Sequence, residues 1–171
     1  CLMVMSCEKD QDLNEPGNLV PKTVVEDPSL PAISVNGTML HAETYGTPNQ
    51  PMVIFLHGGP GSDYKSGLKA KQLAENGYYV VFYDQRGTGL SKRHEKESYN
   101  IQLYLDDLSA VIAHYRTSAS QKVFLFGHSW GAMISAAYIN RYPDKINGAI
   151  FAEAGGFNKE LLDEYGEASR K

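Results

Sequence analysis

Four short apolar runs restrict the fold of this chain more than any other feature of its sequence. They are MVIFL (52–56), YYVVFY (78–83), VFLF (123–126) and AIFA (149–152). Strands that are buried on both faces have this composition, and such strands occur in parallel sheets covered by helices. Segments with helix-like patterns lie between the runs, over residues 63–75, 100–117 and 130–142. This alternation predicts an α/β fold with a mostly parallel sheet.

The folded part of the chain is expected to begin with an antiparallel hairpin. Apolar and polar residues alternate from Ile33 to Val35 and again over 40–44, with Asn36-Gly37 between them. An Asn-Gly pair between two alternating segments is a strong signal for a two-residue hairpin turn. The sheet should therefore have an antiparallel first hairpin ahead of its parallel strands.

The first 32 residues are expected to lie outside the folded domain. CLMVMSC resembles the end of a signal peptide that meets a lipoprotein cleavage site, which predicts loss of residues 1–6 and lipidation of Cys7. Residues 8–32 combine four prolines with mixed charge, a composition that buries little apolar surface and predicts a tether. This interpretation places the protein in the bacterial cell envelope. The alternative is an incidental cysteine on an ordinary N-terminus of a cytoplasmic protein.

Composition argues against several classes of function. A net charge of −4 gives no electrostatic reason to expect nucleic-acid binding. No apolar run approaches the roughly 18 residues of a membrane-spanning helix, so the membrane is expected as a partner only through the lipid anchor. Both cysteines lie in the first seven residues, which excludes a cysteine-based metal site from the rest of the chain. We expect neither a metal nor a cofactor.

GHSWG, residues 127–131, stands between an apolar run and the helix predicted over 130–142. Gly-x-Ser-x-Gly in this strand–turn–helix setting is typical of the nucleophile elbow, a strained turn that exposes the serine hydroxyl. Gly127 and Gly131 lack the side chains that would collide where the strand and the helix approach each other. Ser129 is therefore the predicted catalytic nucleophile.

A glycine-rich loop, HGGPG at 57–61, directly follows the apolar run 52–56. Acyl transfer places negative charge on a carbonyl oxygen, and preorganised backbone N–H groups stabilise that charge. The N–H groups of Gly59 and Trp130 are predicted to form this oxyanion hole. On its own the loop would indicate only a tight turn, but its pairing with the elbow favours the catalytic interpretation.

A third motif, DQRGTGLS at 84–91, follows the run 78–83. It contains two glycines of a nucleotide-binding loop, but Lys92 occupies the position of the third. Asp84 and Arg86 are instead expected to brace this loop against the HGGPG loop, which is a structural role.

The motifs HGGPG, DQRGTGLS and GHSWGA, each after a buried strand and in this order, resemble the proline iminopeptidase family of α/β-hydrolases. The resemblance covers residues 33–156, the predicted core. It implies an eight-stranded sheet with a helical cap inserted after the sixth strand, so residues 157–171 would begin the cap. The chain would then hold the N-terminal part of the fold, without the C-terminal half and the cap.

The catalytic histidine is expected to lie outside this chain. In this fold the triad follows the order Ser, acid, His, and no histidine follows His128. An elbow directs neighbouring side chains differently, so His128 itself is expected to have a packed, structural role. The base is expected beyond Lys171, and the 171-residue chain alone is expected to be inactive.

Glu153, at the end of the last apolar run, has three interpretations. Some α/β-hydrolases place the triad acid at this position. In the iminopeptidases, glutamates near the cap bind the free amino group of the substrate. The third interpretation is a carboxylate that only borders the pocket.

The resemblance implies a serine hydrolase that removes N-terminal residues, preferably proline, from small peptides through an acyl-enzyme. A carboxylesterase or lactonase of the same fold, acting on a small ester, is the first alternative. A non-catalytic binding protein of the envelope is the second. Epoxide hydrolases and haloalkane dehalogenases are disfavoured because they use Asp at the elbow, where this chain has Ser129.

Overall fold

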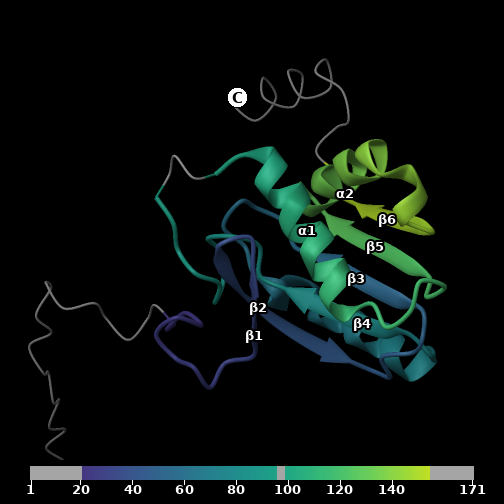
Figure 1. The fold of residues 1–171 in the computed structure, drawn as a ribbon, viewed down its shortest axis with the longest axis horizontal. Helices are drawn as coiled ribbons and strands as arrows, with labels where there is room; N and C mark the ends of the chain where they lie inside the picture. Colours follow the sequence, from purple (N-terminus) through teal and green to yellow (C-terminus); the bar gives the residue numbers. More distant parts are fainter. Residues whose placement is uncertain (1–20, 96–98, 155–171) are drawn as a thin grey trace, which may run out of the picture.

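Six strands form a single sheet in the order β1-β2-β4-β3-β5-β6 (Figure 1). The computed structural model describes residues 21–95 and 99–154. The strands are β1 (Ala32–Val35), β2 (Thr38–Tyr45), β3 (Met52–Leu56), β4 (Tyr79–Tyr83), β5 (Val123–His128) and β6 (Gly148–Ala152). The helical elements are α1 (Ile101–Tyr115), α2 (Trp130–Arg141) and the 3₁₀ segments η1 (Tyr64–Asn76) and η3 (Pro143–Lys145).

The strand directions confirm the predicted mostly parallel sheet with an antiparallel beginning. β1 pairs antiparallel with β2, and Val35 lies opposite Thr38. The turn between them has positive φ at both central residues, 43° at Asn36 and 72° at Gly37, as a hairpin turn of this length requires. β2 is also antiparallel to β4, whereas the β3–β4, β3–β5 and β5–β6 pairs are parallel.

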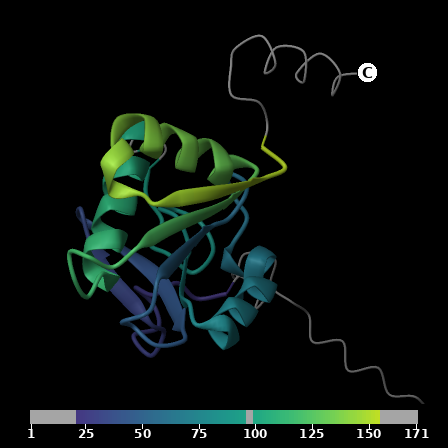
Figure 2. The same ribbon diagram turned by 90° about the vertical axis from the view of Figure 1, so that its right-hand side faces the viewer.

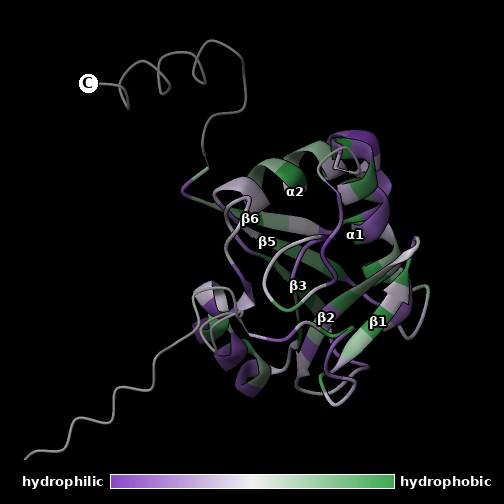
Figure 3. Cartoon of the chain, turned by 90° about the vertical axis from the view of Figure 1, so that its left-hand side faces the viewer, coloured by the Kyte–Doolittle hydropathy of each residue, from purple (hydrophilic) through white to green (hydrophobic). Residues whose placement is uncertain are grey.

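Two hydrophobic clusters cover the two faces of the sheet. The larger cluster joins the strands to α1 and α2, and the smaller joins them to η1 (Figure 2). Successive side chains of β3 point to opposite faces of the sheet, so Ile54 and Leu56 belong to the larger cluster and Phe55 belongs to the smaller one. The central strands are mostly hydrophobic in Figure 3, while the helices carry hydrophilic residues as well. Parallel strands covered on both faces explain the unbroken apolar runs.

β6 differs from the other three apolar runs. Ile150 is 58% exposed and Phe151 is 42% exposed, so the prediction that this run is buried on both faces is wrong. The physical reason is its place at the end of the sheet, where β5 is its one strand neighbour within the described residues. An apolar edge strand of this kind requires cover from other parts of a protein.

The segment predicted as a tether contacts the domain at its C-terminal end. Val24 is 1% exposed, and its N–H donates to the carbonyl of Leu90 at 2.8 Å. Thr23 and Val24 are therefore packed against the domain, whereas most of residues 21–31 are exposed. The predicted signal peptide, Cys7 and the cap segment 157–171 lie outside the described residues. Over the described ranges, no helix is both long enough and apolar enough to cross a bilayer.

Candidate active site

Ser129 occupies a strained turn between β5 and α2. Its φ of 50° and ψ of −115° are uncommon for a residue with a side chain. The turn is held on both sides, because the Ser129 N–H donates to the Ala152 carbonyl at 2.9 Å. The Ser129 carbonyl in turn accepts from the N–H groups of Ala132 and Met133 at 3.0 and 3.2 Å. The backbone thus has the predicted strand–turn–helix geometry of a nucleophile elbow.

The glycines of the GHSWG motif allow this geometry. A Cβ atom at Gly127 would lie 2.6 Å from the Cα of Ala132, and one at Gly131 would overlap the carbonyl oxygen of Leu56 in β3. Both contacts are to backbone, which cannot move away as a flexible side chain can. Strand β5, the start of α2 and the end of β3 therefore approach each other more closely than side chains at these positions would permit.

The Ser129 hydroxyl is available for chemistry. Ser129 is the N-cap residue of α2, yet its side chain makes no capping hydrogen bond. It is half-buried, and its hydroxyl has no hydrogen-bond partner among the described residues. The first N–H groups of a helix have no acceptor within the helix and carry partial positive charge. Trp130, the first residue of α2, places such an N–H beside the serine.

The HGGPG loop lies against the elbow. A Cβ atom at Gly58 would be 2.9 Å from Nδ1 of His128 and 3.3 Å from Cβ of Ser129, so only glycine fits without displacement. Gly59 follows with φ of 134°, and it is exposed. A Cβ atom there would lie 2.6 Å from the amide nitrogen of Gly61. The loop backbone therefore passes beside Ser129, and the predicted oxyanion donors Gly59 and Trp130 belong to the two segments that meet there.

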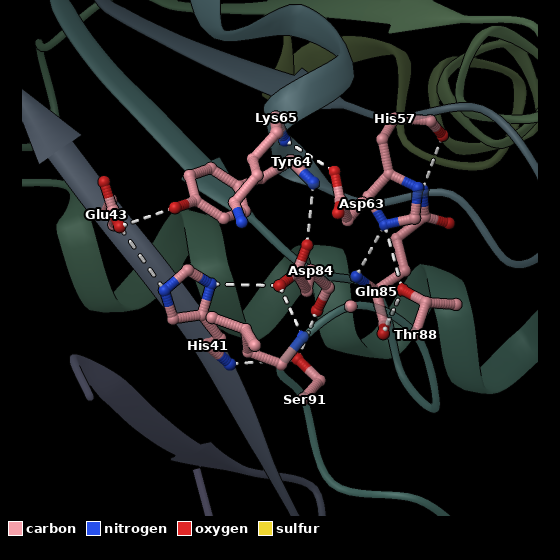
Figure 4. Close-up of polar contacts among 12 residues, drawn as sticks. His41, Glu43, His57, Asp63, Tyr64, Lys65, Asp84, Gln85, Thr88 and Ser91 are labelled. Atoms are coloured by element: carbon pink, nitrogen blue, oxygen red, sulfur yellow. Dashed lines mark hydrogen bonds and ion pairs between the residues drawn. The ribbon is translucent and has the colours of Figure 1, made fainter. Parts of the chain in front are cut away.

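The DQRGTGLS loop is braced differently from the prediction. Asp84 is fully buried and accepts hydrogen bonds from the N–H groups of Tyr64 and Leu90 and from Nδ1 of His41, at 2.7, 2.8 and 3.0 Å (Figure 4). Asp84 thus ties the DQRGTGLS loop to β2 and to Tyr64, which begins η1 just after the HGGPG loop, and not to the HGGPG residues themselves. His41 Nε2 faces the carboxylate of Glu43 at 3.5 Å.

Arg86 does not contact the HGGPG loop, so the expectation for it is wrong. Its guanidinium pairs with Asp107 in α1, with N–O distances of 2.7 and 2.8 Å, and reaches the carbonyl of Asn36 at 3.2 Å. It therefore ties the loop to α1 and to the β1–β2 turn. Gln85 and Thr88 contact His57 of the HGGPG loop instead. The sequence did not predict a role for Gln85, because nothing in the motif marks a neutral amide as important.

His57 is committed to structural hydrogen bonds. It is fully buried; its Nδ1 donates to the carbonyl of Gly58 at 2.7 Å, and its Nε2 accepts from the Gln85 N–H at 3.0 Å. Thr88 Oγ1 lies 3.0 Å from the same Nε2. Burial lowers the pKa of His57 below its ordinary value of 6.5, which agrees with a neutral ring that uses Nε2 as an acceptor. With both ring nitrogens occupied, His57 cannot serve as the base for Ser129.

This environment predicts a pH dependence of stability. Because the folded pKa of His57 is lowered, the unfolded chain binds more protons below about pH 6.5, and stability should fall as the pH decreases through that range. Above pH 6.5 the contribution is fully present. Urea unfolding of the complete protein at several pH values should show a steeper loss for wild type than for His57→Gln. Parallel pH profiles for the two proteins would contradict this assignment.

The carboxylate of Glu153 is hydrogen-bonded to His128 and not to Ser129. Its Oε2 is 2.9 Å from Nε2 of His128, and its side chain is 83% exposed. The His128 ring is 37% exposed, more open than a packed structural role predicts, although its Nδ1 is buried without a partner. No histidine in the described part of the chain is hydrogen-bonded to Ser129. The acid, amine-binding and pocket-border interpretations of Glu153 all remain predictions.

A groove of about 630 Å³ opens beside the predicted oxyanion hole. The Trp130 ring forms part of its wall and is fixed from two sides, by a 3.1 Å hydrogen bond from Nε1 to Oε1 of Gln85 and by an edge-on contact with Tyr104. The walls are mainly apolar and aromatic, and they include Pro60, Gly61, Tyr99, Ile101, Tyr104 and Trp130. Such walls suit an uncharged, apolar group.

Across residues 21–95 and 99–154, no cluster of His, Cys, Asp and Glu could hold a metal ion.

Known proteins resemble this chain in sequence. The sequence model of the family described as serine aminopeptidase, S33, matches residues 47–160. Epoxide hydrolase B of Mycobacterium tuberculosis is 33% identical over 121 residues, which are 69% of this chain and 33% of that protein. Proline iminopeptidase of Thermoplasma volcanium is 31% identical over 148 residues, 81% of this chain and 49% of that protein.

Solved structures agree with the sequence relatives. The epoxide hydrolase VrEH1 from Vigna radiata superposes with a TM-score of 0.64 at 31% identity, covering 71% of this chain and 37% of its own. A thioesterase domain from the curacin biosynthetic pathway gives a TM-score of 0.67 at 26% identity, covering 82% and 52%. The chain thus spans between a third and a half of the length of the relatives it matches, and it covers part of their fold.

Proposed function

Because the chain belongs to the serine aminopeptidase S33 family of α/β-hydrolases, we propose that the complete protein is a serine hydrolase that removes N-terminal residues, preferably proline, from small peptides. The observation that carries this proposal is Ser129 on its strained turn, with an uncapped hydroxyl beside the first N–H of α2 and the HGGPG backbone. Backbone conformations of this kind cluster at functional sites.

The proposed reaction proceeds through an acyl-enzyme. The Ser129 oxygen attacks the carbonyl carbon of the scissile bond while its proton passes to a histidine that we place beyond Lys171. The carbonyl oxygen becomes an oxyanion, which the N–H groups of Gly59 and Trp130 stabilise. The C–N bond then breaks, and the proton returns to the leaving amine. Water attacks the ester in the second half of the reaction and regenerates the Ser129 hydroxyl.

The groove beside the oxyanion hole supports a compact apolar group in the substrate. The aromatic faces of Tyr99, Tyr104 and Trp130 offer contact area to a proline ring. Arg86 also lines the groove, but its charge is already paired with Asp107, so the substrate need not supply a negative charge. Glu153 is the described carboxylate nearest in sequence to the expected cap, and it is exposed enough to meet a free amino group.

Two alternatives stay open within the hydrolase class. A carboxylesterase or lactonase would use the same serine and the same oxyanion donors. Epoxide hydrolases occur among the relatives by name. Epoxide opening by this chain is disfavoured, because epoxide hydrolases use an Asp carboxylate at the elbow and this chain has Ser129 there. A non-catalytic envelope protein is the remaining alternative.

A substrate panel tests the proposal. The complete protein should show its highest kcat/KM on prolyl p-nitroanilide, a lower value on alanyl p-nitroanilide, and no opening of styrene oxide. Faster turnover of p-nitrophenyl acetate than of either anilide would favour the esterase alternative. Opening of styrene oxide would favour the activity named for the Mycobacterium relative. No turnover of any of the four compounds would support the non-catalytic alternative.

We also propose that the protein is anchored to the bacterial envelope through Cys7. The support is the Val-Met-Ser-Cys sequence and the acidic residues that follow it. In the native host, Cys7→Ala should move the protein from the membrane fraction to soluble or unprocessed material, as immunoblots of the fractions would show. Cys1→Ala is the matched control, because Cys1 lies in the part that would be removed. Identical fractionation of wild type and Cys7→Ala would contradict the anchor.

A further inference from the structure

We propose that Gln85 is a positioning residue that holds the two halves of the oxyanion hole at a fixed separation. The inference rests on the proposed function, since an oxyanion hole matters only if Ser129 forms an acyl-enzyme. Gln85 follows Asp84 after β4 and is 1% exposed, so its amide is removed from solvent and from any direct contact with a substrate in the groove.

The side-chain amide of Gln85 bridges the two segments that carry the predicted donors. Its Nε2 donates to the carbonyl of His57 at 2.8 Å, and its Oε1 accepts from Nε1 of Trp130 at 3.1 Å. A third bond runs from the Gln85 backbone N–H to Nε2 of His57 at 3.0 Å, as Figure 4 shows. One residue thus contacts both the first residue of the HGGPG loop and the first residue of α2.

The orientation of this amide is set by its partners. A carbonyl oxygen can only accept a hydrogen bond, and an indole N–H can only donate one. Nε2 must therefore face His57, and Oε1 must face Trp130. Glutamate at position 85 would place a second acceptor against the His57 carbonyl, and methionine would fill similar space without either bond. A neutral amide of this length is the side chain that satisfies both partners.

A bridge is needed here because the HGGPG loop has little conformational restriction of its own. Gly58 and Gly59 precede Pro60, and glycine loses more backbone entropy on folding than any other residue. Fixing the His57 carbonyl fixes the peptide plane just before the Gly58–Gly59 peptide, which carries the predicted donor. Oxyanion stabilisation depends on donors that are already in place when charge develops, and a displacement of about 1 Å can cost about a hundredfold in rate.

Gln85→Met in the complete protein tests this role. We expect kcat to fall about ten- to a hundredfold with KM within about twofold of wild type, because the donors act on the transition state. Hydrogen exchange of the backbone amides of residues 57–61 should become faster. Trp130→Phe removes the other end of the bridge and also alters the groove wall, so the double variant should lose less kcat than the product of the two single losses.

Gln121 provides a matched control at the opposite end of the sheet. It is also buried, and its Nε2 donates to the carbonyls of Pro48 and Gln50 at 2.6 Å each, while its Oε1 accepts from the N–H of Thr117 at 2.8 Å. Gln121→Met removes an equivalent bridge far from Ser129. It should lower stability by a similar amount, yet leave kcat and the exchange of residues 57–61 unchanged.

The outcomes separate this inference from the proposed function. Unchanged exchange of residues 57–61 in Gln85→Met would overturn the bridge, whatever the protein catalyses. Faster exchange with an unchanged kcat, or an equal loss of kcat in Gln121→Met, would overturn its catalytic relevance. If wild type does not react with a fluorophosphonate at Ser129, the proposed function fails and the oxyanion role of Gln85 fails with it. The exchange measurement would still decide whether Gln85 orders the loop.

Discussion

Replacing Ser129 with alanine should lower kcat of the complete protein by about a million-fold while leaving it folded. Covalent catalysis has no substitute nucleophile, and loss of a triad serine has an effect of this order. Stability should change little, because the hydroxyl neither caps α2 nor bonds to any described residue. Alanine keeps the Cβ atom, so the strain at φ of 50° is the same in both proteins.

Steady-state turnover and thermal unfolding measure the two halves of this prediction. Ser135→Ala is the matched control, since it removes a buried hydroxyl from the same helix, one that donates to the Gly131 carbonyl at 2.7 Å. Its kcat should stay within a few-fold of wild type. Retention of more than about one per cent of wild-type activity by Ser129→Ala would show that the elbow serine is not the nucleophile.

The 171-residue chain expressed alone should show no significant peptidase or esterase turnover, the second large effect. An elbow serine needs an adjacent base, and no described histidine is hydrogen-bonded to Ser129. His57 uses both ring nitrogens within the loop, and His41 is held by Asp84. His128 faces Glu153 and the HGGPG backbone.

The test compares this chain with the complete protein in the release of p-nitroaniline from prolyl p-nitroanilide. The complete protein should be active under conditions in which the chain gives only the background rate. Robust release by the chain that disappears in Ser129→Ala would mean that a base lies within residues 1–171. The triad arrangement proposed above would then be wrong.

Local patterns were sufficient to predict the sheet and the elbow. Runs of apolar residues fixed the strands, Asn36-Gly37 fixed the first turn, and the two glycines around Ser129 fixed the close approach of β5 and α2. These features depend on neighbours in the sequence and on backbone sterics. The catalytic roles assigned to Ser129, Gly59 and Trp130 are not settled by backbone geometry, and they stay predictions.

Features set by tertiary contacts could not be predicted in the same way. AIFA has the composition of a central strand, but β6 has β5 as its one strand neighbour within residues 21–95 and 99–154, and the composition of a run does not encode how many neighbours a strand has. Val24 lies in a proline-bearing segment and is nevertheless buried, and its N–H donates to the carbonyl of Leu90. Gln85 looks like any neutral residue until its two partners, 28 and 45 positions away, are placed around it.

The most direct test of whether Ser129 is an activated nucleophile is the reaction of the complete protein with a fluorophosphonate. Intact mass measurement and peptide mapping would then count and locate the adduct. The reagent phosphonylates a serine only where a base and an oxyanion hole activate it. We predict one adduct per molecule, located on the peptide that contains Ser129 and absent from Ser129→Ala. An unmodified complete protein, or an adduct that persists in Ser129→Ala, would contradict the account.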